Sequence, residues 1–297
     1  MSTDDAQSAG FLALKPVMGG IILGQQFETS PLRKLADVQT GGAGAIEFVL
    51  DDDEISSQTL GEGAAPSVSD DATYGLITIT AHERYAMPKL TNMMLEDAMF
   101  DIVGHIQNKA TDKIGRSENA EFINGIGVTQ ARGILTYDAW AAAGTYERNK
   151  LEQVISGSAA AFTADGLIDV QNALKEVYQP NAQWMMKRSA FGAVRKLKDG
   201  ENQYLLGMGP NGLDGQIGMT LLEKPVNFAD DMPAVAADAL AAAYGDFKAG
   251  YVWYDRVGVA VLVDPYTAKG NVLFQVRKRS GGGVVNFEAI KIHKVSA

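Results

Sequence analysis

Residues 91–123, TNMMLEDAMFDIVGHIQNKATDKIGRSENAEFI, carry the strongest structural signal in the chain. Apolar side chains recur there at spacings of three and four, which places them on one face of an α-helix. These side chains are Leu95, Met99, Ile102, Ile106 and Ala110. Thr91 or Asn92 can cap the start, and Gly125 follows the end. An unbroken helix of about 30 residues would be roughly 45 Å long, which is typical of a structural spine.

The chain beyond this segment predicts shorter helices and then strands. Helices are expected over 163–178, ended by Gln179-Pro180-Asn181, and from a cap at Ser189 through Lys198. A glycine-rich loop is expected over 201–224. The expected strands are 183–187, 251–254, 257–263, 272–276 and 284–292. Helices in the middle and strands at both ends indicate an α+β architecture.

The first 87 residues predict two extended parts. Glycines and prolines interrupt residues 1–43, so this arm is either disordered or held by a neighbouring subunit. Strands over 46–50 and 76–87 predict a long hairpin, because Ile77 and Ile79 alternate with polar residues.

Acidic residues crowd the stretch between these two strands, beginning with Asp51, Asp52, Asp53 and Glu54. A two-stranded hairpin is marginally stable alone. Two interpretations stay open: a flexible surface loop, or a projecting arm that docks on a basic surface of a partner. The run lacks the alternating ligand spacing of a dedicated calcium loop, so a solvated face is favoured over a metal site.

Basic residues cluster late in the chain at Arg277, Lys278 and Arg279. Alone, such a cluster is usually solvated charge. Opposite an acidic hairpin, it becomes the candidate docking surface. The run Gly281-Gly282-Gly283 lies between two expected strands and predicts a bend or a flexible turn.

The composition excludes several kinds of chemistry. The chain has no cysteine, which excludes disulfides, thiolate metal sites and cysteine nucleophiles. His82, His105 and His293 are far apart and show no metal-ligand spacing. No P-loop pattern and no grouping of nucleophile, base and orienting residue is present. We therefore expect no catalytic site and no cofactor.

The formal net charge of −10 does not attract nucleic acid to the free chain. Mild acidity is also common among soluble proteins. No apolar run reaches the roughly 20 residues that span a bilayer. Residues Met1 to Gln7 are polar and acidic, unlike a signal peptide, so we expect synthesis in a cytoplasm.

A series of short motifs resembles the major capsid proteins of tailed bacteriophages. The motifs are Phe122-Ile-Asn-Gly-Ile-Gly127, Arg132-Gly-Ile-Leu135, Asn181-Ala-Gln-Trp-Met-Met-Lys-Arg188, Leu197-Lys-Asp-Gly200, Gly245-Asp-Phe247, Tyr251, Asp255-Arg256, Asp264-Pro-Tyr266 and Ala289-Ile-Lys291. Each motif is weak alone, and the ordered series, from about Ser8 to Lys294, is fairly specific.

This resemblance implies the α+β fold named for the Hong Kong ninety-seven phage, in four parts. An N-terminal arm (1–43) precedes an extended hairpin loop (44–87). A peripheral domain (88–138 and 250–285) is built on the spine helix. An axial domain (139–249 and 286–297) points at the symmetry axes of the shell.

Two departures from the family pattern lead to further expectations. Family members often begin with a scaffolding segment, and no long charged helix precedes the arm here. We expect a mature chain whose scaffold was either removed or is a separate protein.

Some relatives also join subunits by a bond between a hairpin lysine and an asparagine. Asn271 falls about where that asparagine lies, but no lysine occurs between Lys34 and Lys89, so we expect the bond to be unused.

The resemblance implies a structural subunit that assembles as hexamers and pentamers into the icosahedral head of a tailed phage around double-stranded DNA. The contacts are expected to be non-covalent. Implied partners are a portal protein, a scaffolding protein or segment, an optional decoration protein, and DNA bound without sequence specificity; no membrane is implied. The chain would be made in a bacterial host cytoplasm and end in the virion. An encapsulin-like compartment or a gene transfer agent shell is the alternative, and an enzyme of unknown type is less favoured.

Overall fold

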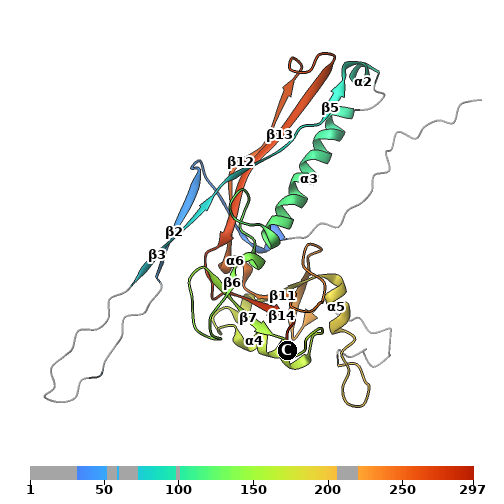
Figure 1. Cartoon of the computed structure of the whole chain (residues 1–297). Coiled ribbons are helices and arrows are strands. Elements are labelled where there is room, and N and C mark those ends of the chain that lie inside the picture. Colours follow the sequence, from blue (N-terminus) through green and yellow to red (C-terminus); the bar gives the residue numbers. More distant parts are fainter. Residues whose placement is uncertain (1–31, 52–58, 60–72, 98–100, 206–219) are drawn as a thin grey trace, which may run out of the picture.

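The computed structural model describes residues 32–51, 59, 73–97, 101–205 and 220–297. The chain forms an elongated body, a rounder body at one end of it, and a hairpin that projects sideways from their junction (Figure 1). Strands and helices occur in both bodies, as the α+β prediction requires.

A five-stranded sheet and one long helix make up the elongated body (Figure 1). The strand order is β1-β12-β13-β4, with β5 also pairing with β13. These strands are β1 (Asp37–Thr40), β4 (His82–Ala86), β5 (Lys89–Thr91), β12 (Tyr251–Asp264) and β13 (Asn271–Val284). The spine helix α3 (Ile102–Asn124) packs along β13. Its partly buried and buried apolar residues meet Phe274 and Val276 of that strand.

The spine helix begins later than the sequence predicts. A short helix, α2 (Asn92–Glu96), is capped by Thr91, and α3 starts afresh where Asp101 accepts a hydrogen bond of 2.9 Å from the Gly104 amide. The prediction of an unbroken helix over 91–123 is therefore wrong at its start, because the Asp101 side chain caps a second helix. At the other end α3 stops before Gly125, as expected.

A seven-stranded mixed sheet forms the rounder body, in the order β6-β7-β14-β11-β8-β10-β9. Its strands are β6 (Asp138–Ala139), β7 (Lys150–Ile155), β8 (Gln183–Met186), β9 (Thr220–Leu221), β10 (Lys224–Phe228), β11 (Leu240–Gly245) and β14 (Ile290–Lys294). Helices α4 (Ala164–Ala173) and α5 (Arg188–Val194) complete it. Trp184 and Tyr244 are fully buried in its core, with ring centroids 4.5 Å apart.

Three helix boundaries in the rounder body differ from the predictions. One is the end of α5, which lies at Val194 instead of Lys198. Helix α4 ends at Ala173 instead of 178, because Leu174 turns to an extended conformation and a separate 3-10 turn, η3 (Gln179–Asn181), follows. Helix α5 begins at Arg188 and has no side-chain cap, so the predicted cap at Ser189 is wrong. Local polar residues mark a helix end well only where their side chains are free to reach the backbone.

The glycine run 281–283 lies inside β13, which corrects the prediction of a bend. A Cβ atom on Gly281 would lie 2.1 Å from the Thr80 carbonyl oxygen, and one on Gly282 would lie 2.5 Å from the Tyr251 hydroxyl. Glycine is needed there because neighbouring backbone and rings approach the strand closely. β12 joins the two strands predicted at 251–254 and 257–263, and β13 extends the one predicted at 272–276. The strand predicted at 284–292 is wrong over 285–289, because β13 ends at Val284 and β14 begins at Ile290.

The base of the predicted arm belongs to the folded body. Helix α1 (Leu32–Leu35) and β1 form what we call the arm base, residues 32–40. Leu32 is fully buried in the main apolar core, which also contains Phe122 and Ile123 of α3. The prediction that residues 1–43 cannot bury themselves is therefore wrong for the arm base; residues 1–31 lie outside the described residues.

The predicted hairpin is present as β2 (Ala45–Asp51) and β3 (Tyr74–Thr80), paired antiparallel from Ala45↔Thr80 to Asp51↔Tyr74. The predicted second strand, 76–87, is wrong beyond Thr80, because Ala81 interrupts it and β4 then pairs with β13 of the large sheet. Two short connecting elements, η2 (Ile134–Thr136) and α6 (Phe247–Gly250), lie at the junction of the two bodies.

Candidate assembly surfaces

The acidic hairpin tip is only partly placed by the structure. Asp51 is the last residue of β2 and is exposed. Asp52, Asp53 and Glu54 lie outside the described residues. Their docking on a basic surface of a neighbour stays a prediction.

The alternation of side chains along β13 divides the predicted basic cluster. Arg277 is exposed and Arg279 is half-buried, whereas Lys278 points inward and is buried. The Lys278 Nζ atom lies 2.6 Å from Glu118 Oε1 on α3. The expectation that Lys278 faces a neighbour is therefore wrong, because successive residues of a strand point to opposite faces. The roles of Arg277 and Arg279 stay a prediction.

Lys278 belongs to a cluster of three cations and three carboxylates, which we call the charged junction. It joins the arm base, β4, α3, β12 and β13. Its members are Arg33, Arg84, Glu118, Glu121, Asp255 and Lys278. The formal charges sum to zero, so each buried charge has an opposite neighbour, as buried ions require.

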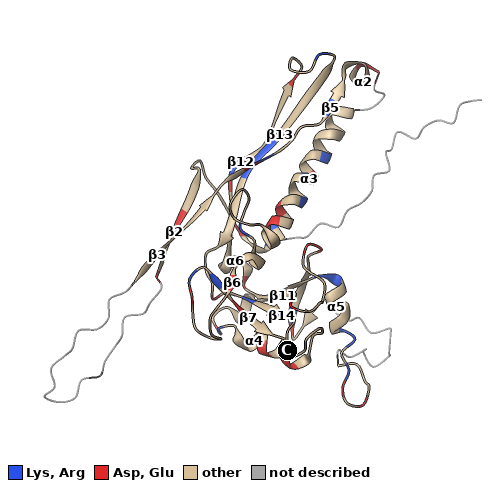
Figure 2. Ribbon diagram, viewed as in Figure 1, with Lys and Arg blue, Asp and Glu red and all other residues tan. Residues whose placement is uncertain are grey.

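Hydrogen bonds fix the geometry of this junction. The Arg84 guanidinium donates to both carboxylate oxygens of Glu121, and the distance from Arg84 Nε to Glu121 Oε1 is 2.7 Å. Figure 2 shows the acidic end of α3 beside the sheet. Glu118 also accepts from the Ser280 hydroxyl at 2.8 Å. Asp255 accepts from Trp253 Nε1 at 3.2 Å and lies 3.6 Å from Lys278 Nζ.

Sequence reasoning missed this junction, although one signal was present. Glu118 and Glu121 follow Ile114 and precede Phe122 on the buried side of α3, where carboxylates interrupt the apolar stripe. A buried carboxylate implies a buried cation. The identity of that cation was not predictable, because Lys278 lies 160 positions away.

The outer edge of β12 is apolar and unpaired. β1 covers only its start, ending where Thr40 pairs with Asp255. Among the described residues, no strand pairs with that edge from Val257 to Asp264. The exposed apolar side chains on this segment are Val257, Val259, Val261, Leu262 and Val263.

The hairpin β2–β3 also has one unpartnered apolar face. Val49 and Leu76 are directly opposite each other and are 72% and 57% exposed. The other face is covered near its base, where Ile79 packs with Val252 and Tyr254 of β12. The chain thus carries two exposed apolar surfaces on extended elements that reach away from its own core (Figure 1).

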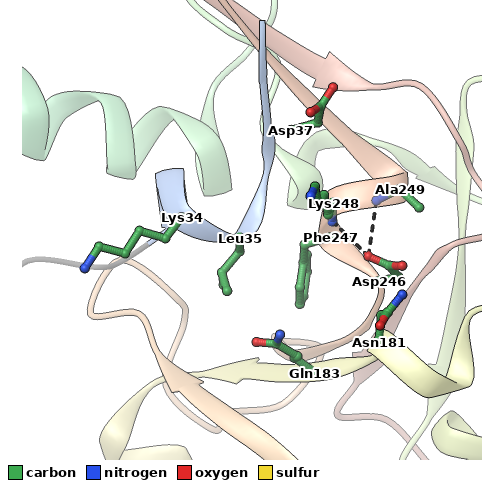
Figure 3. A pocket seen from close by; sticks show the side chains of 9 residues that line it. All are labelled: Lys34, Leu35, Asp37, Asn181, Gln183, Asp246, Phe247, Lys248 and Ala249. Carbon is green, nitrogen blue, oxygen red and sulfur yellow. Dashed lines mark hydrogen bonds between the residues drawn. The ribbon is translucent and has the colours of Figure 1, made fainter.

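A cleft of about 520 Å³ lies between the arm base, α6 and the start of β8 (Figure 3). Asp246 is occupied as the cap of α6, since its Oδ1 accepts from the amides of Lys248 and Ala249 at 3.1 and 3.2 Å. The Phe247 side chain, which also lines the cleft, is buried. The charged side chains at the rim, Lys34 and Asp37 among them, form no grouping of nucleophile and base.

Buried titratable groups serve packing. Burial raises the pKa of Tyr137 and of Tyr251, whose hydroxyls bond to the Val284 amide (3.0 Å) and the Arg132 carbonyl (2.9 Å). Burial lowers the pKa of His293 to about 4.

Within the described residues, no three His, Asp or Glu side chains are grouped to hold a metal ion. No helix in that part of the chain is long and apolar enough to cross a membrane.

Comparison with solved structures places this fold among capsid proteins. The capsid of a native GTA (gene transfer agent) particle matches with a TM-score of 0.91 and 35% identity, covering 100% of this chain and 99% of that chain. The capsid of an empty GTA particle matches with a TM-score of 0.91, 36% identity and the same coverage. Gordonia phage Cozz matches with a TM-score of 0.64 and 14% identity over 97% and 93% of the two chains, which shows the fold alone.

The phage capsid family is matched over residues 9–295, and the chain belongs to that family. No curated protein matches it. The chain is a capsid shell protein of phage or gene transfer agent particles, with the Hong Kong ninety-seven-like fold, and is structural instead of enzymatic. The resemblance found in its sequence motifs is confirmed.

Proposed function

We propose that copies of this chain assemble into a closed icosahedral shell that encloses double-stranded DNA and is held by non-covalent contacts alone. The observation that carries the proposal is the long apolar edge of β12. It is unpaired from Val257 to Asp264, as far as the described residues go.

An exposed apolar edge strand is a liability for a protein that works alone. Soluble proteins protect such edges with lysine, proline or a short strand length. Residues 257–263, VGVAVLV, contain neither charge nor proline. In a symmetric assembly the same surface is offered by every copy, so a second copy can cover it in each subunit. Burial of a fully exposed valine contributes about 1.5–3 kcal/mol, and each of these valines contributes about half of that, because they are 40–50% exposed in the single chain.

The hairpin β2–β3 also carries an apolar surface that a second copy could cover. Its exposed face, with Val49 and Leu76, cannot reach its own core, and a two-stranded hairpin gains stability when another surface covers it. A neighbouring copy supplies that surface in a shell. We assign the strength of assembly to these apolar contacts.

Ion pairs contribute less to the strength of assembly than the apolar contacts do. An exposed pair contributes only about 0–1 kcal/mol. The acidic tip at Asp51, meeting Arg277 and Arg279 of a neighbour, would therefore orient subunits more than it would bind them. The exposure of Arg277 supports this assignment.

Covalent joining of subunits is not part of the proposal. The chain has no cysteine, and the hairpin has no lysine between Lys34 and Lys89 to act as a nucleophile. Asn271, at the position of the family asparagine, starts β13 and donates a hydrogen bond of 3.1 Å to the Lys269 carbonyl.

The proposal implies a set of partners and a location. Copies of the chain would form hexamers and pentamers, and a portal protein and a scaffolding protein or segment would join them during assembly, with a decoration protein as an option. The chain would be synthesised in a bacterial host cytoplasm. Its parts would be the arm, the hairpin loop, and the peripheral and axial domains expected above.

Two kinds of particle fit this role, the head of a tailed phage and the shell of a gene transfer agent. The second is favoured by one observation, the 35% identity to a GTA capsid over the full chain, against 14% to the capsid of Gordonia phage Cozz. Both kinds of particle keep the same fold, the same contacts and a cargo of double-stranded DNA, and they differ in the origin of that DNA.

Nuclease protection tests the cargo. Particles purified from the source cells are treated with DNase, and the protected DNA is sequenced. A single repeated genome indicates a phage head, and random fragments of the host chromosome indicate a gene transfer agent. Particles that protect no DNA under any growth condition would contradict the proposal and favour an encapsulin-like compartment.

A further inference from the structure

We propose that Arg33 is a latch that holds the arm base on the spine helix, and that the arm base can open at this point while both bodies stay folded. The latch would hold the arm base in the same place in every copy of a shell. Only this role in a shell rests on the proposed function, because all contacts of the Arg33 latch lie within one chain.

Arg33 bridges two carboxylates on different elements. Its Nη1 atom lies 3.4 Å from Glu118 Oε2 on α3, and its Nη2 atom binds Asp255 Oδ2 on β12. A planar guanidinium with several donors is suited to such a bridge, whereas an ammonium is a single point charge. Arg33 therefore connects the arm base to both the spine helix and the long sheet.

Exposure separates Arg33 from the rest of the charged junction. Its side chain is 42% exposed, while Glu118 is 8% exposed and Asp255 11% exposed. The other three members are exposed by 11–13%. Salt screens an exposed charge much more than a buried one. Arg33 is consequently the member of the junction that solvent and ions reach most easily.

The remaining charges stay paired when Arg33 leaves. Glu118 keeps Lys278 at 2.6 Å and Ser280 at 2.8 Å. Asp255 keeps Trp253 at 3.2 Å and has Lys278 at 3.6 Å, but loses its bound guanidinium. The junction then has two cations against three carboxylates, so opening has a local cost without leaving an isolated buried ion.

The other attachments of the arm base are short. β1 forms four residue pairs with β12, from Asp37↔Val252 to Thr40↔Asp255. Leu32 and Ala36 are buried in the main apolar core, and Leu35 packs against that core. Beyond β1, the Gly41 amide donates to the Asp255 carbonyl at 3.2 Å. A short segment near one end of the described chain can open separately from the global unfolding of the chain, and the latch requires that it does.

Hydrogen exchange of the unassembled full chain tests the latch. Exchange of the β1 amides is compared between wild type, Arg33→Gln and Lys34→Gln. Lys34 is the matched control, since it is the next residue, has the same charge, and makes no ion pair among the described residues. Arg33→Gln should speed exchange in β1 at least tenfold, and Lys34→Gln should leave it unchanged. Arg33→Lys should fall between wild type and Arg33→Gln.

Equal exchange in Arg33→Gln and Lys34→Gln would overturn the latch, and so would faster exchange throughout α3 and β14. If Arg33→Gln does not fold, wild-type chain is compared at 0.05 and 1 M NaCl. Faster exchange confined to β1 in high salt supports the latch, and no change in β1 overturns it. Because no shell is present, either outcome is independent of whether the chain encloses DNA.

Discussion

His293 shows how one residue can make this shell protein sensitive to acid. Its side chain is fully buried in β14 and stacks on Phe162 with ring centroids 5.0 Å apart. Neither ring nitrogen has a hydrogen-bond partner, and its cross-strand neighbours are Val154 and Ala242. Nothing there stabilises a charged imidazolium, so burial lowers the pKa of His293 from 6.5 to about 4.

The lowered pKa predicts a loss of stability in mild acid. Above pH 6.5 the imidazole is neutral in both folded and unfolded chains. As the pH falls below 6.5, the unfolded chain binds a proton that the folded chain excludes, until the pH reaches about 4. The loss across this window is about 3 kcal/mol. Urea unfolding of the unassembled chain at pH 7.5, 5.5 and 4.5 measures it.

The variant His293→Leu serves as the comparison, because it removes the titrating group and keeps the site apolar. All other titrating groups are common to both chains and cancel in the difference between the two curves. The difference should grow as the pH falls from 6.5 toward 4. Two parallel curves would show that His293 is not the acid-sensitive group.

Residue-scale predictions failed where a contact distant in sequence decides the outcome. The basic triplet was visible in the sequence, but the inward direction of Lys278 depends on Glu118 of α3. The glycine run was read as a turn, whereas Gly281 is required by the approach of Thr80. Both facts arise from the packing of segments that are far apart in the chain.

At the scale of elements, the outer edge of β12 gives the sharpest prediction about assembly. Val259→Lys together with Val261→Lys should leave the chain folded, because both side chains are exposed and surface substitutions usually change the free energy of unfolding by less than about 0.5 kcal/mol. The fraction in large particles should fall at least tenfold, since lysine on an edge strand blocks pairing. Analytical ultracentrifugation measures that fraction.

The matched control replaces the same two valines with threonine, which keeps β propensity and adds no charge. The threonine variant should assemble close to wild type. Normal particles from the lysine variant would show that this edge is not an interface. A lysine variant that unfolds at a lower urea concentration than the threonine variant would show a role in the monomer instead.

Elements with strong local signals were the most predictable. The end of the spine helix at Asn124 and the hairpin at 45–51 and 74–80 match periodicity and alternation in the sequence. The break at Asp101 was not predicted, because the apolar stripe continues across it. The lengths of β12 and β13 were also missed, because they depend on mutual pairing.

At the scale of the whole molecule, the absence of a hairpin lysine predicts how particles dissociate. Boiled in denaturant, purified particles should give one band near 31.7 kDa on a denaturing gel. Non-covalent interfaces separate under these conditions, whereas amide bonds survive. A ladder of higher species would show that another side chain takes the role of the missing lysine.

The overall fold was predictable only from the ordered series of motifs, since composition and periodicity indicate no more than an α+β chain. The placement of the arm base against α3 could not be predicted, because Arg33 and Glu118 are 85 positions apart. Contacts between copies are even harder to predict from the sequence. They depend on surfaces such as the β12 edge, whose exposure is known only once the fold is known.

We propose that this chain builds a closed shell with copies of itself. Electron microscopy of the purified, expressed chain, together with size-exclusion chromatography, tests it most directly. Scaffolding protein is supplied if the chain alone stays soluble and unassembled. We expect closed particles of uniform diameter in which a neighbouring copy covers residues 257–263. A compact monomer that never forms particles under either condition would contradict it.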